Sequence, residues 1–155
     1  MPSAEHIAET VNRYISLIAK GTADDLVELY ADDATVEDPV GGEVHIGRQA
    51  IHGFYSAVEN VQRECELVTL RVAGNEAAFH FKLTVSAGDS RMVIEPIDVM
   101  VFDADGKVAA MRLGVPPPAS GGEAGNQPRG SLPLSVRVRC RVLRWLDPDH
   151  LVSGS

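Results

Sequence analysis

The spacing of apolar residues changes its period part-way along the chain, and this change constrains the fold more than any other feature. Between residues 5 and 58 apolar residues recur at intervals of three and four, which is typical of amphipathic helices. From residue 67 onward they alternate with polar residues, which predicts strands with one buried face. Helices followed by successive strands indicate an α+β fold rather than an alternating α/β fold.

Three helices are predicted in the first part of the chain. The first ends near Gly21, and Thr22 begins a second helix with Asp25 in a capping-box position. We expect this second helix to end at Asp32-Asp33, and a third to follow Gly47. The apolar positions of the three helices are, in order, Ile7, Val11, Tyr14, Ile15 and Ile18; Leu26, Leu29 and Tyr30; and Ile51, Phe54, Tyr55 and Val58.

One short strand is predicted between the second and third helices, and an antiparallel meander is predicted after the third. A short strand over residues 34–38 closes at Pro39, and four more are predicted over residues 67–72, 77–86, 92–102 and 108–113. Pro96 lies inside the fourth of these five segments, and because proline cannot donate a ladder hydrogen bond it implies an edge position or a bulge. A curled sheet with the helices against one face would enclose a pocket.

The last part of the chain has a different composition. Pro116, Pro117 and Pro118, followed by several glycines, break any regular structure, and residues 113–155 hold five Arg against three acidic residues. The alternation of Val136, Val138, Cys140 and Val142 with Arg favours either an added strand with a basic outer face or a partly disordered basic segment. We therefore predict a domain over residues 1–115 and a Pro/Gly/Arg-rich tail over residues 116–155.

Charge and motif content exclude several classes of partner. The formal net charge is −8, which argues against nucleic acid, and no apolar run reaches the roughly 18 residues that suit a membrane span. The N-terminal residues lack the features of a signal peptide, and Cys65 and Cys140 lie far apart, so a cytoplasmic protein with reduced thiols is expected. The histidines have no metal-ligand spacing and no glycine-rich nucleotide loop is present, so we expect neither metal nor cofactor.

Two carboxylates are candidates for chemistry. Asp98 lies within an otherwise apolar strand and should share a face with Met100 and Phe102. A carboxyl group there must be neutral, paired or hydrogen-bonded, although an edge position, a bulge or a salt bridge would also explain it. Asp38 ends a short strand, where a carboxylate is usually a solvated turn residue, so the pattern alone does not assign it a role.

The chain has three tyrosines, Tyr14, Tyr30 and Tyr55, and each lies on the apolar face of its predicted helix. They could be ordinary core residues. Alternatively, three buried phenols and a buried carboxyl group would need one another as hydrogen-bond partners, which predicts a polar cluster facing a shared cavity.

Four segments of the chain resemble ketosteroid isomerase in order and in spacing, over about residues 5–112. They are Val11-Asn12-Arg13-Tyr14, residues 29–39 (LYADDATVEDP), Phe54-Tyr55 and Ile97-Asp98-Val99-Met100. The resemblance implies the cone-shaped α+β fold shared with nuclear transport factor 2, a homodimer and a steroid substrate.

The resemblance also implies roles for individual residues. Asp38 would be the general base that moves a proton within a 3-oxo-Δ5 steroid, and Tyr14 and Asp98 would stabilise the dienolate oxygen. A neutral carboxylic acid used in this way is a known feature of that enzyme. Tyr30 and Tyr55 would support the network. The residues implied for the apolar steroid-binding wall are Phe54, Phe79, Phe81, Val99 and Met100.

Other functions on the same fold stay open at this stage. A polyketide cyclase or SnoaL-like enzyme would also use an acid–base Asp, and a non-catalytic steroid-binding module would need no neutral carboxyl group beside a phenol. The resemblance also implies an aromatic pair after Met111-Arg112, where this chain has Leu113-Gly114-Val115-Pro116. We hypothesise that the divergent tail arises from a shifted reading frame, because its composition is what a GC-rich gene gives in a wrong frame.

Overall fold

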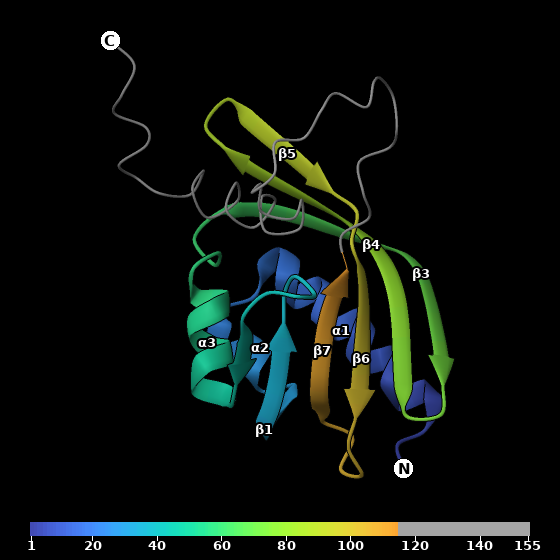
Figure 1. Cartoon of the computed structure of the whole chain (residues 1–155). Coiled ribbons are helices and arrows are strands. Elements are labelled where there is room, and N and C mark those ends of the chain that lie inside the picture. The colour runs from blue at the N-terminus through green and yellow to red at the C-terminus, as the bar shows by residue number, and fades with distance from the viewer. Residues whose placement is uncertain (115–155) are drawn as a thin grey trace, which may run out of the picture.

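The computed structural model describes residues 1–114 (Figure 1). The predicted tail, with its alternating valines and Cys140, lies outside the described residues. Ten elements follow one another along the described chain: α1 (Ala4–Lys20), α2 (Ala23–Val27), β1 (Tyr30–Glu37), β2 (Val44–Ile46), α3 (Arg48–Ser56), β3 (Gln62–Ala73), β4 (Glu76–Ala87), β5 (Ser90–Ile94), β6 (Ile97–Phe102) and β7 (Val108–Gly114). The predicted α+β fold with three helices is confirmed.

The seven strands form one curved sheet. In Figure 1 the sheet faces the viewer and α1 runs behind it. The strand order is β2-β1-β7-β6-β4-β3, and β5 pairs with β4. All neighbouring pairs are antiparallel except β1 and β7, which are parallel. The parallel pair places the end of β1 beside the end of β7, with Glu37 opposite Arg112.

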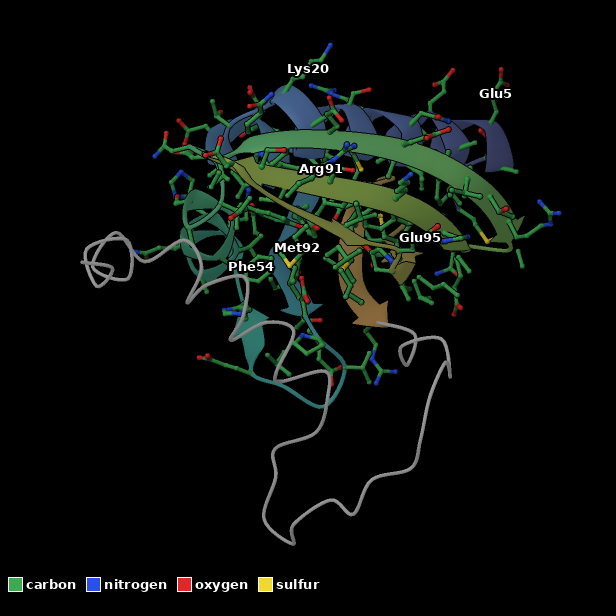
Figure 2. The ribbon with its side chains drawn as sticks, turned by 90° about the horizontal axis from the view of Figure 1, so that it is seen from above. Glu5, Lys20, Phe54, Arg91, Met92 and Glu95 are labelled. Carbon is green, nitrogen blue, oxygen red and sulfur yellow. The ribbon has the colours of Figure 1, made fainter. Side chains whose placement is uncertain are left out.

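The sheet bends where β4 changes its partner. Residues 76–80 of β4 pair with β6, whereas residues 83–87 pair with β5. Between β5 and β6 the chain passes through Pro96, whose carbonyl accepts a 3.3 Å hydrogen bond from the Phe81 N–H. The single strand predicted over residues 92–102 is therefore corrected to two strands, and the irregularity expected at Pro96 is confirmed. Figure 2 shows from above how β3 and β4 curve along α1.

The second helix is shorter than the sequence pattern predicted. It ends at Val27, and Tyr30 is the first residue of β1, where it pairs with Val108. The prediction that Tyr30 lies on a helix is wrong, because the backbone around it bonds to β7: the Val108 N–H donates to the Leu29 carbonyl at 2.9 Å. The short strand β2, which pairs with β1 next to the α3 helix, was not predicted.

The core lies between α1 and the inner face of the sheet, which we define as the face that carries Asp98. Ile7 and Val11 of α1 are fully buried, as are Met100 of β6 and Val108 of β7. Burying a side chain of this size contributes about 1.5–3 kcal/mol relative to exposing it. The core cluster of the described chain runs from Ile7 to Leu113, which supports our proposal that the domain comprises residues 1–115.

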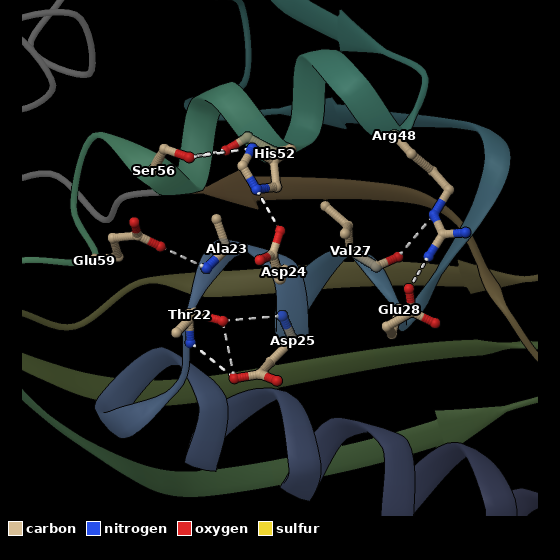
Figure 3. A network of polar contacts seen from close by, with 10 residues as sticks. All are labelled: Thr22, Ala23, Asp24, Asp25, Val27, Glu28, Arg48, His52, Ser56 and Glu59. Atoms are coloured by element: carbon tan, nitrogen blue, oxygen red, sulfur yellow. Dashed lines mark hydrogen bonds and ion pairs between the residues drawn. The ribbon is translucent and has the colours of Figure 1, made fainter.

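Polar contacts hold α2 and α3 together (Figure 3). Thr22 and Asp25 form the predicted capping box at the start of α2, and the His52 imidazole of α3 contacts the Asp24 carboxylate at 2.7 Å. Arg48 of α3 bonds to Glu28 at 2.7 Å. Such exposed pairs add little stability individually. The burial of Ile51 and Tyr55 in the core is the stronger constraint on the position of α3.

No helix within residues 1–114 is both long enough and apolar enough to cross a membrane.

Candidate active site

Four polar side chains meet inside the core. The Tyr14 hydroxyl of α1 donates a 3.3 Å hydrogen bond to Oδ2 of Asp98 on β6. The hydroxyls of Tyr30 and Tyr55 lie 2.6 Å apart, and the hydroxyls of Tyr55 and Tyr14 also interact. Each of these four side chains is at most 2% exposed. The predicted polar cluster is thus formed, although Tyr30 reaches it from a strand.

Asp98 lies on the buried face of β6. The burial of β6 alternates, so Asp98 shares its face with Met100 and Phe102, as the sequence pattern predicted. The pairing of Asp98 with Phe79 on β4 and Leu113 on β7 places two more apolar residues beside the carboxyl group. Its Oδ1 atom is buried and makes no hydrogen bond to any side chain or backbone group of the described chain. An ionised carboxylate in this position would lack solvation.

Burial raises the pKa of Asp98 well above its ordinary value, and the negative charge of Asp38 raises it further. The hydrogen bond from Tyr14 opposes this shift in pKa without cancelling it. The site therefore favours the protonated form of Asp98, which has a hydrogen that it can donate.

Burial also raises the pKa values of Tyr14, Tyr30 and Tyr55 well above that of a free phenol. For Tyr14 the next cause is the charge of Asp98, whose ionised form would repel a phenolate. All three phenols stay protonated at neutral pH, and so each keeps a hydrogen to donate.

Asp38 follows the last residue of β1 and is half-buried. Ala34 and Val36, at alternate positions before it, are buried on the inner face. The charge of Asp38 raises the pKa values of Asp98, Tyr14 and Tyr30, so its carboxylate lies near all three side chains. The site thus combines one carboxyl group in a dry setting with one that is partly exposed to water.

Aromatic side chains surround the polar cluster. The ring of Tyr14 meets Phe79 and Phe81 edge-on, with ring centroids 5.8 and 6.4 Å apart. Phe54 of α3 contacts Tyr55 at 5.0 Å and is half-buried, and it lies on the α3 side of the molecule in Figure 2. With the fully buried Met100, four of the five predicted wall residues lie on the side of the sheet that carries the cluster.

Val99 does not belong to this group. It lies between Asp98 and Met100 in β6, and successive side chains of a strand point to opposite faces. Val99 is only half-buried and faces away from Asp98, so the prediction that it lines the same wall is corrected.

His45 was not predicted to lie near the site, yet its ring lies 4.9 Å from that of Phe54. His45 pairs with Val36 across β1 and β2, which puts both on the inner side. The only signal was the position of His45 opposite β1, which could not be used because β2 was not predicted.

Cys65 does not form a reactive centre. Burial raises the pKa of its thiol to about 12, which disfavours the nucleophilic thiolate.

Among residues 1–114 no cluster of His, Cys, Asp and Glu side chains has the arrangement of a metal site.

The raised pKa of Asp98 predicts a pH-dependent stability. Between the pKa of an unfolded Asp and the higher folded value, the folded state binds more protons, so the free energy of unfolding falls as pH rises, by up to about 1.4 kcal/mol per pH unit. Asp98→Asn, which is neutral and of the same shape, should lack this decline. Urea denaturation of both proteins from pH 5 to pH 8 measures the difference, and parallel pH profiles would show that Asp98 is ionised when folded.

Comparison with known proteins identifies the family. Residues 11–111 match the SnoaL-like domain family. The chain is 46% identical over 110 residues to the steroid Delta-isomerase of Nocardioides simplex, covering 71% of this chain and 89% of that protein. The fold is similar to that of SalBIII, an epoxide hydrolase/cyclase-like enzyme with a role in pyran ring formation in polyether salinomycin. The two structures give a TM-score of 0.68 at 25% sequence identity, and the match covers 75% of this chain and 95% of SalBIII. These matches confirm the resemblance stated above: the chain belongs to the ketosteroid isomerases of the SnoaL-like, nuclear transport factor 2-like superfamily, and it is an enzyme of the isomerase class.

Proposed function

We propose that this enzyme converts 3-oxo-Δ5 steroids into 3-oxo-Δ4 steroids by moving one proton within the substrate. The observation that carries the proposal is the juxtaposition of the fully buried Asp98 carboxyl group, whose pKa is raised, and the Tyr14 hydroxyl, with the charge of Asp38 close by. The 46% identity to a steroid Delta-isomerase supports the steroid as the substrate class.

Asp38 is the proposed general base. Its carboxylate removes a proton from the carbon between the ketone and the double bond, and the electrons move onto the ketone oxygen to form a dienolate. The same carboxyl group then returns the proton to the far end of the dienolate, which completes the shift of the double bond. Because one proton leaves and one returns, and no electrons are gained or lost, the reaction needs no cofactor.

Tyr14 and Asp98 are the proposed donors to the dienolate oxygen, toward which the single Tyr14 O–H would turn from Asp98 when the substrate binds. Both carry a hydrogen at neutral pH, because burial holds their pKa values above the ordinary range. Donors fixed in a dry site stabilise a developing charge more than water does, because they need no reorganisation as the charge appears. The phenol pair Tyr30 and Tyr55 supports Tyr14 from behind through hydrogen bonding.

The proposed steroid-binding wall consists of Phe54, Phe79, Phe81 and Met100. Apolar side chains next to a few directed polar groups suit a flat, apolar ligand with one polar end. In this arrangement the ketone would point toward Tyr14 and Asp98, and the rings would contact the wall.

A second candidate function is cyclisation or hydration of a polyketide, which the structural similarity to SalBIII favours. Isomerase activity fits better than cyclisation or hydration because the Tyr14–Asp98 pair suits a dienolate oxygen. A third alternative, a steroid-binding module without catalysis, fits less well because it has no use for a neutral carboxyl group beside a phenol.

Replacing the base tests the mechanism. We expect Asp38→Asn to reduce turnover by roughly 10²–10⁴-fold, the usual contribution of a positioned general base. Binding of equilenin, a phenolic steroid that imitates the dienolate, should persist because the donors are unchanged. The assay is the rise in enone absorbance after addition of 5-androstene-3,17-dione. Equal turnover of both proteins would remove Asp38 as the base, and no turnover by the unaltered enzyme would contradict the proposed reaction.

We also propose that the enzyme is a homodimer assembled through the outer face of the sheet, the face opposite Asp98. Ile97 on this face is 49% exposed, and Val99 and Val101 follow it at alternate positions of β6. In Figure 1 this face is turned toward the viewer while α1 lies behind the sheet. Contiguous apolar side chains on a sheet face commonly mark a protein interface.

The cytoplasmic location stays a prediction of the sequence.

A charge placed in this face should separate the subunits. We expect sedimentation to give twice the 16.6 kDa chain mass for the unaltered enzyme and the chain mass for Ile97→Glu. Ser16→Glu on the exposed side of α1 is the control and should leave the dimer intact. A single-chain mass for the unaltered enzyme, or a dimer of Ile97→Glu as stable as that of the control, would contradict this interface.

A further inference from the structure

Glu37 makes contacts that no step of the proposed reaction uses. It precedes Asp38 and points to the opposite side of β1, where it pairs with Arg112 of β7. Its two carboxylate oxygens have separate partners. Oε1 accepts a 2.7 Å hydrogen bond from the Gly41 N–H, and Oε2 accepts a 2.8 Å hydrogen bond from Nε of Arg112. One side chain therefore connects the turn after β1 with the neighbouring strand.

The turn that this carboxylate holds carries Asp38. We call residues 38–42 the base turn. Its other backbone contacts are a 2.9 Å bond from the Val40 N–H to the Leu113 carbonyl and a 2.9 Å bond from the Gly42 N–H to the Pro39 carbonyl. Among these contacts, only those of Glu37 and Val40 tie the turn to β7. Gly41 has φ 87°, a conformation that glycine adopts without strain and that directs its N–H toward Glu37.

We propose that Glu37 is a positioning residue, which holds the base turn against β7 through Gly41 and Arg112 and thereby fixes the carboxylate of Asp38 over the substrate. This inference rests on the proposed function, because it assigns Glu37 a role in presenting the proposed base.

The charge state of Glu37 suits this role. The Gly41 N–H and then Arg112 lower the pKa of its carboxyl group, so Glu37 is ionised at neutral pH. Hydrogen bonds to an ionised acceptor are shorter and stronger than those between neutral groups. The Glu37 side chain is 20% exposed and that of Arg112 is 59% exposed.

An exposed ion pair of this kind adds little to folding stability. Reactivity is more sensitive, because a displacement of about 1 Å between reacting groups can cost up to about 10²-fold in rate. The predicted signature is therefore a loss of turnover without a comparable loss of stability or of steroid binding.

The first test is Glu37→Ala, assayed with 5-androstene-3,17-dione. We expect kcat to fall roughly tenfold while KM and the affinity for equilenin stay within about twofold, because the wall and the donors are untouched. Glu37→Gln keeps an oxygen that can accept from Gly41 but loses the charge, so its kcat should lie between those of Glu37→Ala and the unaltered enzyme. The control is Glu28→Ala, which also removes a carboxylate bonded to an arginine, Arg48 at 2.7 Å, although the Glu28 side chain is 65% exposed, and its kcat should not change.

Combining variants separates positioning from general damage. In an Asp38→Asn background, Glu37→Ala should cause no further loss, because no base is left to position. If Glu37→Ala lowers residual turnover by the same factor in both backgrounds, or if kcat is unchanged in the single variant, the proposal is overturned. A fall in equilenin affinity or in thermal stability matching the loss of kcat would likewise show a merely structural role.

Hydrogen exchange of the Gly41 amide tests the tether without relying on activity. We expect at least tenfold faster exchange in Glu37→Ala than in the unaltered enzyme or in Glu28→Ala, because a lost hydrogen bond worth about 1.4 kcal/mol changes protection tenfold. Unchanged exchange would contradict the tether itself. An enzyme with a protected Gly41 amide and no isomerase activity would refute the proposed function while confirming the tether.

Discussion

The carboxyl group of Asp98 is fully buried beside Tyr14, Phe79 and Leu113, so that a charge on it would be poorly solvated. An isolated carboxylate in such surroundings is so unfavourable that the group keeps its proton instead. The Tyr14 hydroxyl satisfies one of its oxygens at 3.3 Å. The chemistry that we propose depends on this one cost of desolvation, because it turns an ordinary acid into a hydrogen-bond donor at neutral pH.

The sheet brings the second carboxyl group to the first. Asp38 and Asp98 are 60 residues apart in the chain. Asp38 follows β1, which pairs in parallel with β7, and Asp98 lies on β6, which pairs antiparallel with β7, so a single strand separates β1 from β6. Asp38 stands at the end of its strand, half-exposed, whereas Asp98 is in the middle of the core. In the mechanism that we propose, the same residue type serves as a base at one position and as a donor at the other, because the two sites differ in access to water.

Periodicity in the sequence was enough to predict the three helices, most of the strands and the inward direction of Asp98. The alternation with Met100 and Phe102 is a local property, which the sheet preserves. The same alternation should have excluded Val99 from the wall, and the structure makes that correction. Tyr30 was placed on a helix because Leu26, Leu29 and Tyr30 fit its spacing, but pairing with β7 prevailed over local preference. The role of Asp38 came from family resemblance, since no local pattern reveals a contact formed between distant strands.

The central claim is that Asp98 is neutral in the folded enzyme at neutral pH. The most direct measurement is the ¹³C chemical shift of the Asp98 carboxyl carbon, followed through a pH titration of the folded protein and assigned with Asp98→Asn. Our account predicts a protonated carboxyl signal that persists through pH 7. A transition to the carboxylate near the ordinary Asp value of about 4 would contradict the account, because Asp98 would then have no proton to donate.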